Sequence, residues 1–163
     1  VVPSERYYLS YLDYIRELAD EERYPFTLDL DFASCDDLLT QLKNFSNGEN
    51  LPDDKVPNST LWLIDRDNIV GITNVRHYLN TSIEYCGGHI GLGIRPSRRG
   101  EGLGNLLMKL SIEYLSNLGV QKIHIHCYRE NVSSARTIVN SGGVLESEII
   151  DNQQVIQRYL VEP

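Results

Sequence analysis

The chain has 163 residues, a length that fits one domain with a well-buried core, and 41% of them are hydrophobic, which excludes a disordered chain. Its formal net charge of -8 argues against nucleic acid or an anionic membrane as a partner, because an acidic surface repels phosphate groups. A neutral or cationic small substrate is electrostatically easier to bind.

The first third of the chain is predicted to be helical. Apolar and aromatic side chains recur at helical spacing over residues 4–18, which predicts a helix there. Ser34 is a predicted N-cap for a second helix, whose apolar residues extend to Phe45. The polar stretch 46–59 contains glycine and proline, so it is predicted to be a long loop.

From residue 60 onward the pattern becomes one of strands alternating with helices. Two strand-like runs, 60–64 and 69–77, flank a charged turn and predict a β-hairpin. The rest of the pattern predicts strands over 88–94, 122–128, 144–150 and 155–161, a helix over 103–118, and a helix that follows Asn131 and ends before Gly142.

This order of elements predicts a mixed α/β fold in one domain over residues 1–163. We expect the helical region 4–45 to lie on the substrate side and residues 60–163 to form the core. The strand–helix–strand unit over 88–128 is predicted to be a parallel, right-handed crossover. Such a unit places the loop after its first strand at the carboxyl end, where ligands bind in open α/β sheets.

No membrane-spanning or export signal is recognisable in the sequence. It contains no run of about 18 apolar residues and no signal-peptide pattern at the N-terminus, so we expect a cytoplasmic protein. The three cysteines, Cys35, Cys86 and Cys127, are odd in number and widely separated, which favours free thiols over a disulfide framework. His124 and His126 share one face of a predicted strand, but no further ligand stands at recognisable spacing, so no metal site is expected.

The most informative segment is the glycine-rich loop that precedes the predicted helix over 103–118. From Arg98 to Gly104 it reads Arg-Arg-Gly-Glu-Gly-Leu-Gly. Glycines let several backbone N–H groups turn toward one point, and the helix adds its free N–H groups and the positive end of its dipole. We therefore predict that the loop binds a phosphate-bearing anion, beside a basic cluster of Arg95, Arg98 and Arg99.

The spacing of the glycines separates this loop from two common phosphate-binding motifs. No Gly-Lys-Ser/Thr follows them, which excludes a Walker-type loop, and Gly100, Gly102 and Gly104 do not fit the Gly-x-Gly-x-x-Gly fingerprint of dinucleotide-binding proteins. The pattern Arg-x-x-Gly-x-Gly is met by Arg99, Gly102 and Gly104. In this respect the loop resembles the acetyl-CoA signature of the GNAT superfamily of N-acetyltransferases.

A second segment agrees with this resemblance. Asn131-Val-Ser-Ser134, followed by a helix and two glycines, is similar to a later segment of the same superfamily. The glycine-rich run 87–91 is similar to that of a branch of uncharacterised predicted acetyltransferases. The resemblance covers about residues 60–163. It implies the acyl-CoA N-acyltransferase fold, in which helices flank a central, mostly antiparallel sheet with one parallel β-α-β crossover.

The resemblance implies acetyl-CoA as the co-substrate and assigns residues to it. The pyrophosphate is expected to accept hydrogen bonds from backbone N–H groups of Arg99, Gly100, Glu101, Gly102, Leu103 and Gly104. The pantetheine arm is expected to pair with main-chain groups of Leu92 and Ile94, with Gly91 and Gly93 allowing a close approach. A backbone N–H of this strand would then stabilise the negative charge that develops on the thioester oxygen.

Asn131 and Ser134 match positions of the superfamily that contact the pantetheine or the phosphate region. Asn131 can also serve simply as a helix cap, and both interpretations remain open.

Acetyl transfer to an amine needs a group that removes a proton from the ammonium, and the departing thiolate benefits from a proton donor. The superfamily often has a carboxylate at the position that corresponds to Gly88, so the candidate bases here are His89 and Glu84. The tyrosine of many relatives corresponds to Ile138. Tyr128 is therefore the candidate donor, with Cys127 beside it as an alternative, unless the thiolate leaves without help.

We expect an N-acetyltransferase that moves acetyl from acetyl-CoA to a primary amine of a small molecule or peptide by direct attack in a ternary complex. The acceptor is expected under the N-terminal helices and the loop 46–59, where the acidic run 20–22 and Asp53 and Asp54 would suit a cationic amine. No nucleic-acid or membrane partner is expected, and a homodimer is a further hypothesis. The alternatives are a CoA-binding sensor or partner-binding module without acyl transfer, and a nucleotide-phosphate binder on another α/β fold.

Overall fold

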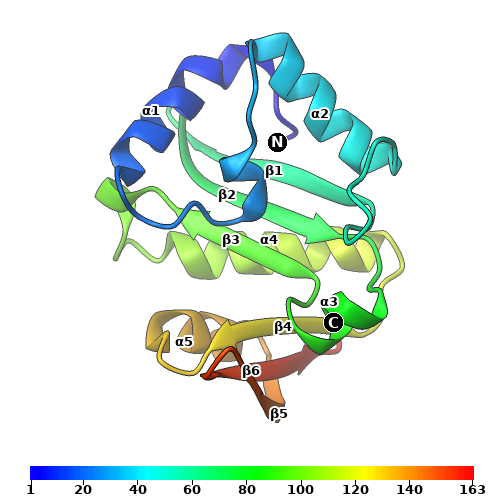
Figure 1. Ribbon diagram of the computed structural model, residues 1–163. Coiled ribbons are helices and arrows are strands. Elements are labelled where there is room, and N and C mark those ends of the chain that lie inside the picture. The colour runs from blue at the N-terminus through cyan, green and yellow to red at the C-terminus, as the bar shows by residue number, and fades with distance from the viewer.

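A computed structural model describes residues 1–163 and contains two three-stranded antiparallel sheets with helices packed against them (Figure 1). The first sheet has the strand order β1-β2-β3, and the second has the order β4-β6-β5. The strands are β1 (Asn58–Asp65), β2 (Asn68–Arg76), β3 (Ile90–Ile94), β4 (Ile123–Tyr128), β5 (Val144–Asp151) and β6 (Gln154–Val161). The helices are η1 (Glu5–Tyr7), α1 (Tyr8–Leu18), η2 (Phe26–Asp29), α2 (Cys35–Asn47), α3 (Thr81–Tyr85), η3 (Pro96–Arg98), α4 (Leu103–Asn117) and α5 (Val132–Asn140).

The long helices and the strands confirm the predictions made from the apolar pattern, with small differences at their ends. Ser34 caps α2, since its Oγ accepts the N–H of Asp37 at 3.1 Å, and Gly48 ends this helix with a φ of 78°. The short helices η2, α3 and η3 were not predicted, because a helix of one turn is too short to show a periodic apolar face.

Apolar side chains form two buried clusters on opposite sides of the first sheet. One cluster joins α1 and α2 to β1 and β2, and in it Tyr11 stacks on Trp62 with 5.4 Å between the ring centroids. The other joins Ile90 of β3 to α4, α5 and the second sheet. In Figure 1, α1 and α2 lie above β1 and β2, and α4 runs behind β3. The second cluster is therefore what holds the two sheets together.

The predicted parallel crossover is not confirmed. β3 and β4 form no ladder, and the one bridge at this place is antiparallel and joins Gly88, two residues before β3, to Ile125 of β4. Gly88 has a φ of 69°, and a Cβ atom there would lie 2.6 Å from the carbonyl oxygen of His124, so only glycine permits this contact. Beyond the bridge the two strands separate, and a cleft takes the place of the expected ladder.

Two further observations concern the cysteines and the length of the helices. Cys35, Cys86 and Cys127 are all free thiols, as predicted. Each helix is either too short or too polar to cross a bilayer.

Candidate functional site

The cleft between β3 and β4 has a volume of about 930 Å³. It starts near the Gly88–Ile125 bridge and extends to the loop before α4. Its walls come from β3, β4, the first turns of α4, and α5, together with Glu22 and Tyr24 from the segment between α1 and η2. The predicted cofactor-binding residues that line it are Leu92, Ile94, Arg99, Gly100, Gly102, Leu103, Gly104, Asn131 and Ser134.

The glycine-rich loop presents free backbone N–H groups to this cleft. The N–H groups from Gly100 through Asn105 have no hydrogen-bond acceptor within the protein. Gly100 and Gly102 have φ values of 84° and 79°, a conformation that favours glycine, and a Cβ atom added at either would meet no atom within 4 Å. The loop and the N-terminus of α4 therefore form an open cradle for an anion.

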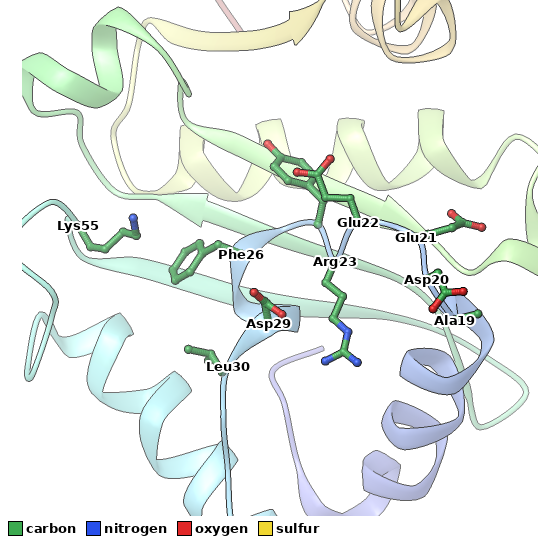
Figure 2. Close-up of a pocket in the computed structure, with 10 residues that line it drawn as sticks. Ala19, Asp20, Glu21, Glu22, Arg23, Phe26, Asp29, Leu30 and Lys55 are labelled. Atoms are coloured by element: carbon green, nitrogen blue, oxygen red, sulfur yellow. The ribbon is translucent and has the colours of Figure 1, made fainter. Parts of the chain in front are cut away.

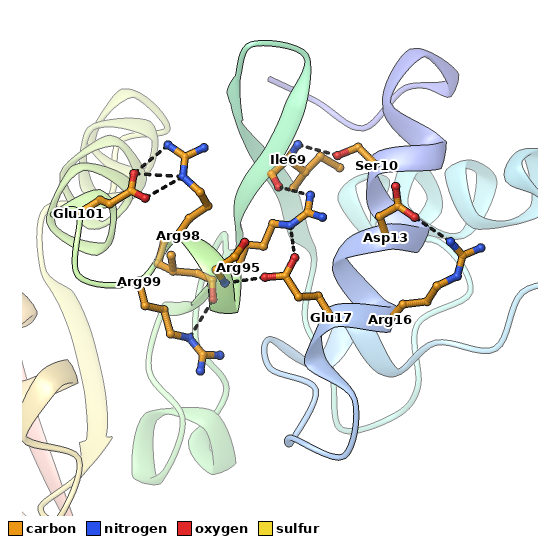
Figure 3. Close-up of polar contacts among 11 residues, drawn as sticks. Ser10, Asp13, Arg16, Glu17, Ile69, Arg95, Arg98, Arg99 and Glu101 are labelled. Carbon is orange, nitrogen blue, oxygen red and sulfur yellow. Dashed lines mark hydrogen bonds and ion pairs between the residues drawn. The ribbon is translucent and has the colours of Figure 1, made fainter.

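The predicted basic cluster is paired with carboxylates, so it is not a free positive patch. The Arg95 Nε lies 2.6 Å from Glu17. The Arg98 Nη2 lies 2.9 Å from Asp65 and 2.8 Å from Glu101, and the Arg98 Nε also contacts Glu101. Figure 3 shows Glu17 and Glu101 facing these two guanidinium groups. This pairing leaves the main-chain N–H groups as the unpartnered donors of the loop.

Arg99 is paired as well, although it remains on the wall of the cleft. Its Nη2 lies 2.7 Å from Glu21 Oε2, and its Nε donates to the carbonyl oxygen of Ile94 at 3.2 Å. The Arg99 guanidinium holds the pKa of the Glu21 carboxyl below its usual value.

β3 pairs with β2 along one edge and leaves its other edge free. At the two ends of this ladder the Arg76 N–H donates to the His89 oxygen (2.8 Å) and the Arg95 N–H donates to the Val70 oxygen (3.0 Å). Hydrogen-bonded and non-hydrogen-bonded pairs alternate in an antiparallel ladder. The residues whose N–H and C=O groups point away from β2, toward the cleft, are therefore Ile90, Leu92 and Ile94. Of these groups, the Ile94 oxygen already accepts the Arg99 Nε.

Gly91 and Gly93 were predicted to allow a close approach of the pantetheine arm, but in the structure they allow a close approach of Tyr24. A Cβ atom at Gly91 would lie 2.8 Å from the Tyr24 hydroxyl oxygen, and one at Gly93 would lie 2.6 Å from the Tyr24 carbonyl oxygen. The two glycines therefore admit Tyr24 onto the face of β3, and the free edge of the strand is what remains for a ligand.

Asn131 caps α5 and also lines the cleft. Its Oδ1 accepts the backbone N–H of Ser134 at 3.0 Å, which is the hydrogen bond of an N-cap. The structure thus supports the capping interpretation and leaves room for a ligand contact by Asn131 and Ser134.

Of the candidates His89, Glu84 and Tyr128, Tyr128 alone lines the cleft, at the end of β4. His89 is only 5% exposed and lies outside the lining; its Nδ1 accepts the backbone N–H of His124 at 3.0 Å. Burial, followed by the nearby His124, lowers the pKa of His89 to about 4. Glu84 lies on α3 and does not line the cleft.

A second cavity of about 800 Å³ lies on the α1 side of the first sheet (Figure 2). Its lining is rich in carboxylates and comes from the segment between α1 and η2, from η2 and from Lys55. The charged residues that line it are Asp20, Glu21, Glu22, Arg23, Asp29 and Lys55. Glu22 and Tyr24 line both cavities, so the two cavities adjoin each other at these residues.

Glu22 is the one carboxylate among the residues that line the cleft, and no motif in the sequence marks it as a catalytic candidate. In Figure 2 its side chain points away from that of Arg23. The acidic run 20–22 was the available signal. Such a run is usually a solvated surface, and only the fold brings this one to the cleft.

The thiols of Cys86 and Cys127 also line the cleft. Burial raises the pKa of Cys127 to about 11 and also raises that of Cys86. Since the thiolate is the reactive form of cysteine, neither residue has the environment of an activated nucleophile.

Comparisons with known proteins agree with this geometry. The sequence profile of the acetyltransferase (GNAT) family matches residues 12–138. A spermidine N-acetyltransferase from Vibrio cholerae is 20% identical, with 98% of this chain and 92% of that chain covered and a TM-score of 0.64. A putative acetyltransferase, yncA from Salmonella typhimurium with its cofactor acetyl-CoA, is 12% identical over 98% and 90% of the chains, with a TM-score of 0.66. 

An aminoglycoside acetyltransferase in complex with coenzyme A is 15% identical over 79% and 76% of the chains, with a TM-score of 0.58. No curated protein matches the chain. At these identities the solved structures establish the likeness of fold, whereas the profile match covers most of the chain.

Proposed function

The chain belongs to the acetyltransferase (GNAT) family, with acetyl-CoA as the co-substrate, and from this premise we propose that it acetylates a primary amine of a positively charged small molecule. Transfer takes place by direct attack of the amine while both substrates are bound. Acetyl-CoA supplies the acetyl group as a thioester.

The observation that carries this proposal is the open cradle of N–H groups from Gly100 through Asn105. A diphosphate offers several acceptor oxygens to such a cradle, and the N-terminus of α4 adds the positive end of its dipole. The empty space in front of Gly100 and Gly102 leaves room for these oxygens. Arg99 stands beside the cradle and adds positive charge once a phosphate competes with Glu21 for it.

The free edge of β3 suits the rest of the co-substrate. The pantetheine arm carries amide groups that can pair with the N–H and C=O groups of Leu92, as an added strand would. Asn131 and Ser134 lie on the opposite wall, where they can contact the arm or a phosphate. The side chain of Glu101 stays with Arg98, so Glu101 contributes only its backbone N–H.

The acidic cavity is the proposed site of the acceptor. Four of its lining residues are carboxylic acids, Asp20, Glu21, Glu22 and Asp29, and they favour a substrate with several positive charges. The similar structures include enzymes named for spermidine and for aminoglycosides, which are amines with several charged nitrogens. Their names support a polyamine-like acceptor for this chain.

Glu22 is the proposed base, because it lies where the two cavities adjoin. Its carboxylate can hold the ammonium group of the acceptor and take its proton, directly or through a water molecule. Tyr128 is the proposed donor to the departing thiolate, since of His89, Glu84 and Tyr128 it alone lies on the wall of the cleft. The raised pKa of Cys127 and Cys86 supports direct transfer over a cysteine-bound acetyl group.

The test combines binding with turnover. Calorimetric titration with acetyl-CoA and with CoA measures the affinity of the cradle for each ligand. Release of the CoA thiol in the presence of a panel of amines measures the rate of acetyl transfer. We expect binding of both ligands and turnover with polyamines or aminoglycosides in preference to neutral amines. Tight CoA binding without turnover of any amine would favour the sensor hypothesis. Absence of CoA binding would refute the site itself.

A further inference from the structure

His126 is the one histidine on the wall of the cleft, and no role has been assigned to it above. It is 9% exposed. Side chains alternate along β4, and Ile123 and Ile125 face the apolar cluster that contains α4. His126 therefore points to the opposite face of β4, on the same side as Tyr128.

The hydrogen bonds of His126 identify which ring nitrogen carries the proton. The backbone N–H of Gly87 donates to its Nδ1 at 3.0 Å, so Nδ1 carries no hydrogen. Burial, followed by the charge of Arg158, lowers the pKa of His126 to about 4, which keeps the ring neutral near pH 7. The proton of the neutral ring then resides on Nε2.

Nε2 is buried and has no hydrogen-bond partner in the protein. A buried N–H group without an acceptor costs free energy, and native proteins keep few of them without a ligand or water to complete the bond. Because the residue lines the cleft, a bound ligand is the natural source of the acceptor.

The position of His126 indicates which part of the co-substrate reaches it. His126 follows Ile125, which forms the bridge with Gly88, two residues before β3, whereas the cradle follows Ile94 at the end of β3. At about 3.3 Å per residue, Ile90 and Ile94 lie about 13 Å apart along β3, and Gly88 lies two residues further from the cradle. The extended pantetheine arm spans a comparable distance from diphosphate to thioester, so the acyl end lies nearest to His126.

We propose that His126 is a catalytic hydrogen-bond donor whose neutral Nε2–H binds the carbonyl oxygen at the acyl end of acetyl-CoA, an inference that rests on the proposed function. As the amine nitrogen forms its bond to the carbonyl carbon, an electron pair of the C=O bond moves onto this oxygen, and the Nε2–H stabilises the charge. The pair then returns, the C–S bond breaks and its electrons leave on the thiolate. Glu22 takes the first proton of the ammonium group before the attack. The nitrogen loses its second proton as the amide forms, and this proton balances the one that Tyr128 gives to the thiolate, so the products are the amide and the CoA thiol.

Two substitutions separate this role from the packing of the ring. In His126→Asn the side-chain oxygen can still accept the Gly87 N–H, but the donor at the position of Nε2 is lost. In His126→Gln an amide N–H can reach that position instead. His124→Asn is the matched control, because His124 stands on the same face of β4 and does not line the cleft.

Calorimetry with acetyl-CoA and with CoA provides a readout apart from turnover. We expect the wild-type protein and His124→Asn to bind acetyl-CoA more tightly than CoA, and His126→Asn to bind the two equally. The kcat of His126→Asn should fall roughly 100-fold, as for loss of one oxyanion donor, with His126→Gln recovering part of it. A His126→Asn variant that keeps both the acetyl-CoA preference and its kcat overturns the proposal.

Nuclear magnetic resonance of wild-type protein with ¹⁵N-labelled histidine serves as a second measurement if the variants do not fold. We expect the Nε2–H resonance of His126 to shift with acetyl-CoA and to stay in place with CoA. Equal shifts with both ligands contradict a bond to the acyl oxygen. Failure of the wild-type protein to bind either ligand refutes the proposed function, whereas normal binding with an unmoved resonance refutes only the role of His126.

Discussion

Arg99 and Glu21 join the two cavities, since the Arg99 Nη2 lies 2.7 Å from Glu21 Oε2 while Arg99 lines the cleft and Glu21 lines the acidic cavity. Both side chains are 49% exposed, and exposed ion pairs of this kind are weak. A phosphate in the cradle can therefore draw Arg99 away from Glu21. The carboxylate released in this way faces the cavity proposed for the cationic acceptor.

This relationship predicts that Glu21→Gln strengthens CoA binding in the absence of an acceptor. Arg99 then no longer has to leave a carboxylate, and we expect the Kd for CoA to fall about two- to fivefold. Asp20→Asn is the control, because it removes the same charge from the same segment without a bond to Arg99. An equal gain in both variants, measured by calorimetry, would attribute the effect to net charge alone.

Gly102→Ala should weaken CoA binding by about tenfold or more, because its methyl group enters the open space in front of the cradle. Gly119→Ala is the matched control. Gly119 has a similar positive φ, 89° against 79°, equally open surroundings, and a position outside the cleft. Both variants should lose a similar amount of thermal stability. The loop assignment fails if Gly102→Ala binds CoA as Gly119→Ala does.

Glu22→Gln should lower kcat/KM for a cationic amine by about 100-fold, since it removes the carboxylate proposed to bind the ammonium and take its proton. The Kd for acetyl-CoA should stay unchanged. Glu84→Gln tests the competing candidate, because Glu84 lies outside the cleft. Steady-state kinetics on both variants decide between the two bases. A fall in kcat/KM that is confined to Glu84→Gln would favour Glu84, the base predicted from the sequence.

Asn131→Asp distinguishes a helix cap from a ligand contact. Aspartate is as good an N-cap as asparagine, so the free energy of unfolding should change little. If Asn131 also contacts the phosphate region, the added negative charge should raise the Kd for CoA several-fold, and less so at high salt. Titrations at two salt concentrations check this. An unchanged Kd would leave capping as its role.

Stability should fall on acidification between about pH 6.5 and pH 4. The pKa values of His89 and His126 are lowered to about 4 in the folded protein from an ordinary value of 6.5. Below 6.5 the unfolded chain therefore binds protons that the folded chain does not, so the free energy of unfolding decreases as the pH falls. Each histidine contributes up to about 1.4 kcal/mol per pH unit. 

Urea unfolding at several pH values measures this slope. His126→Asn should reduce the slope, because one of the two buried rings is then missing. A free energy of unfolding that stays flat over this range would contradict the buried, neutral state of both rings.

Local patterns account for the parts of the fold that the sequence predicts well. The helical spacing of the apolar residues in α4 and the turn signals between β1 and β2 depend on neighbours in the chain, and both predictions are confirmed. The glycines at positions 100 and 102 were also informative, since their φ values and free N–H groups follow from the loop itself. 

Contacts between distant segments could not be predicted in this way. The pairing of Arg95 with Glu17 and of Arg99 with Glu21 depends on how α1 docks beside η3. The places of Glu22 and His126 also depend on the packed fold. The sequence indicates that His126 shares one face of β4 with His124, but it does not indicate which cavity that face meets. The separation of β3 from β4 is likewise a property of the packed molecule, since a strand–helix–strand pattern alone favours a continuous ladder.

Tyr24 lies against Gly91 and Gly93, so β3 offers peptide backbone and no side chains on that face. Tyr24 covers this backbone, so a ligand in the acidic cavity meets the tyrosine and not the strand, and a side chain at either glycine would displace the tyrosine. In the acceptor site that we propose, the choice among amines then depends on the side chains of the segment between α1 and η2, with Tyr24 held in place by its packing on β3. New specificities can arise in this architecture by altering one connecting segment while the acetyl-donor half stays as it is.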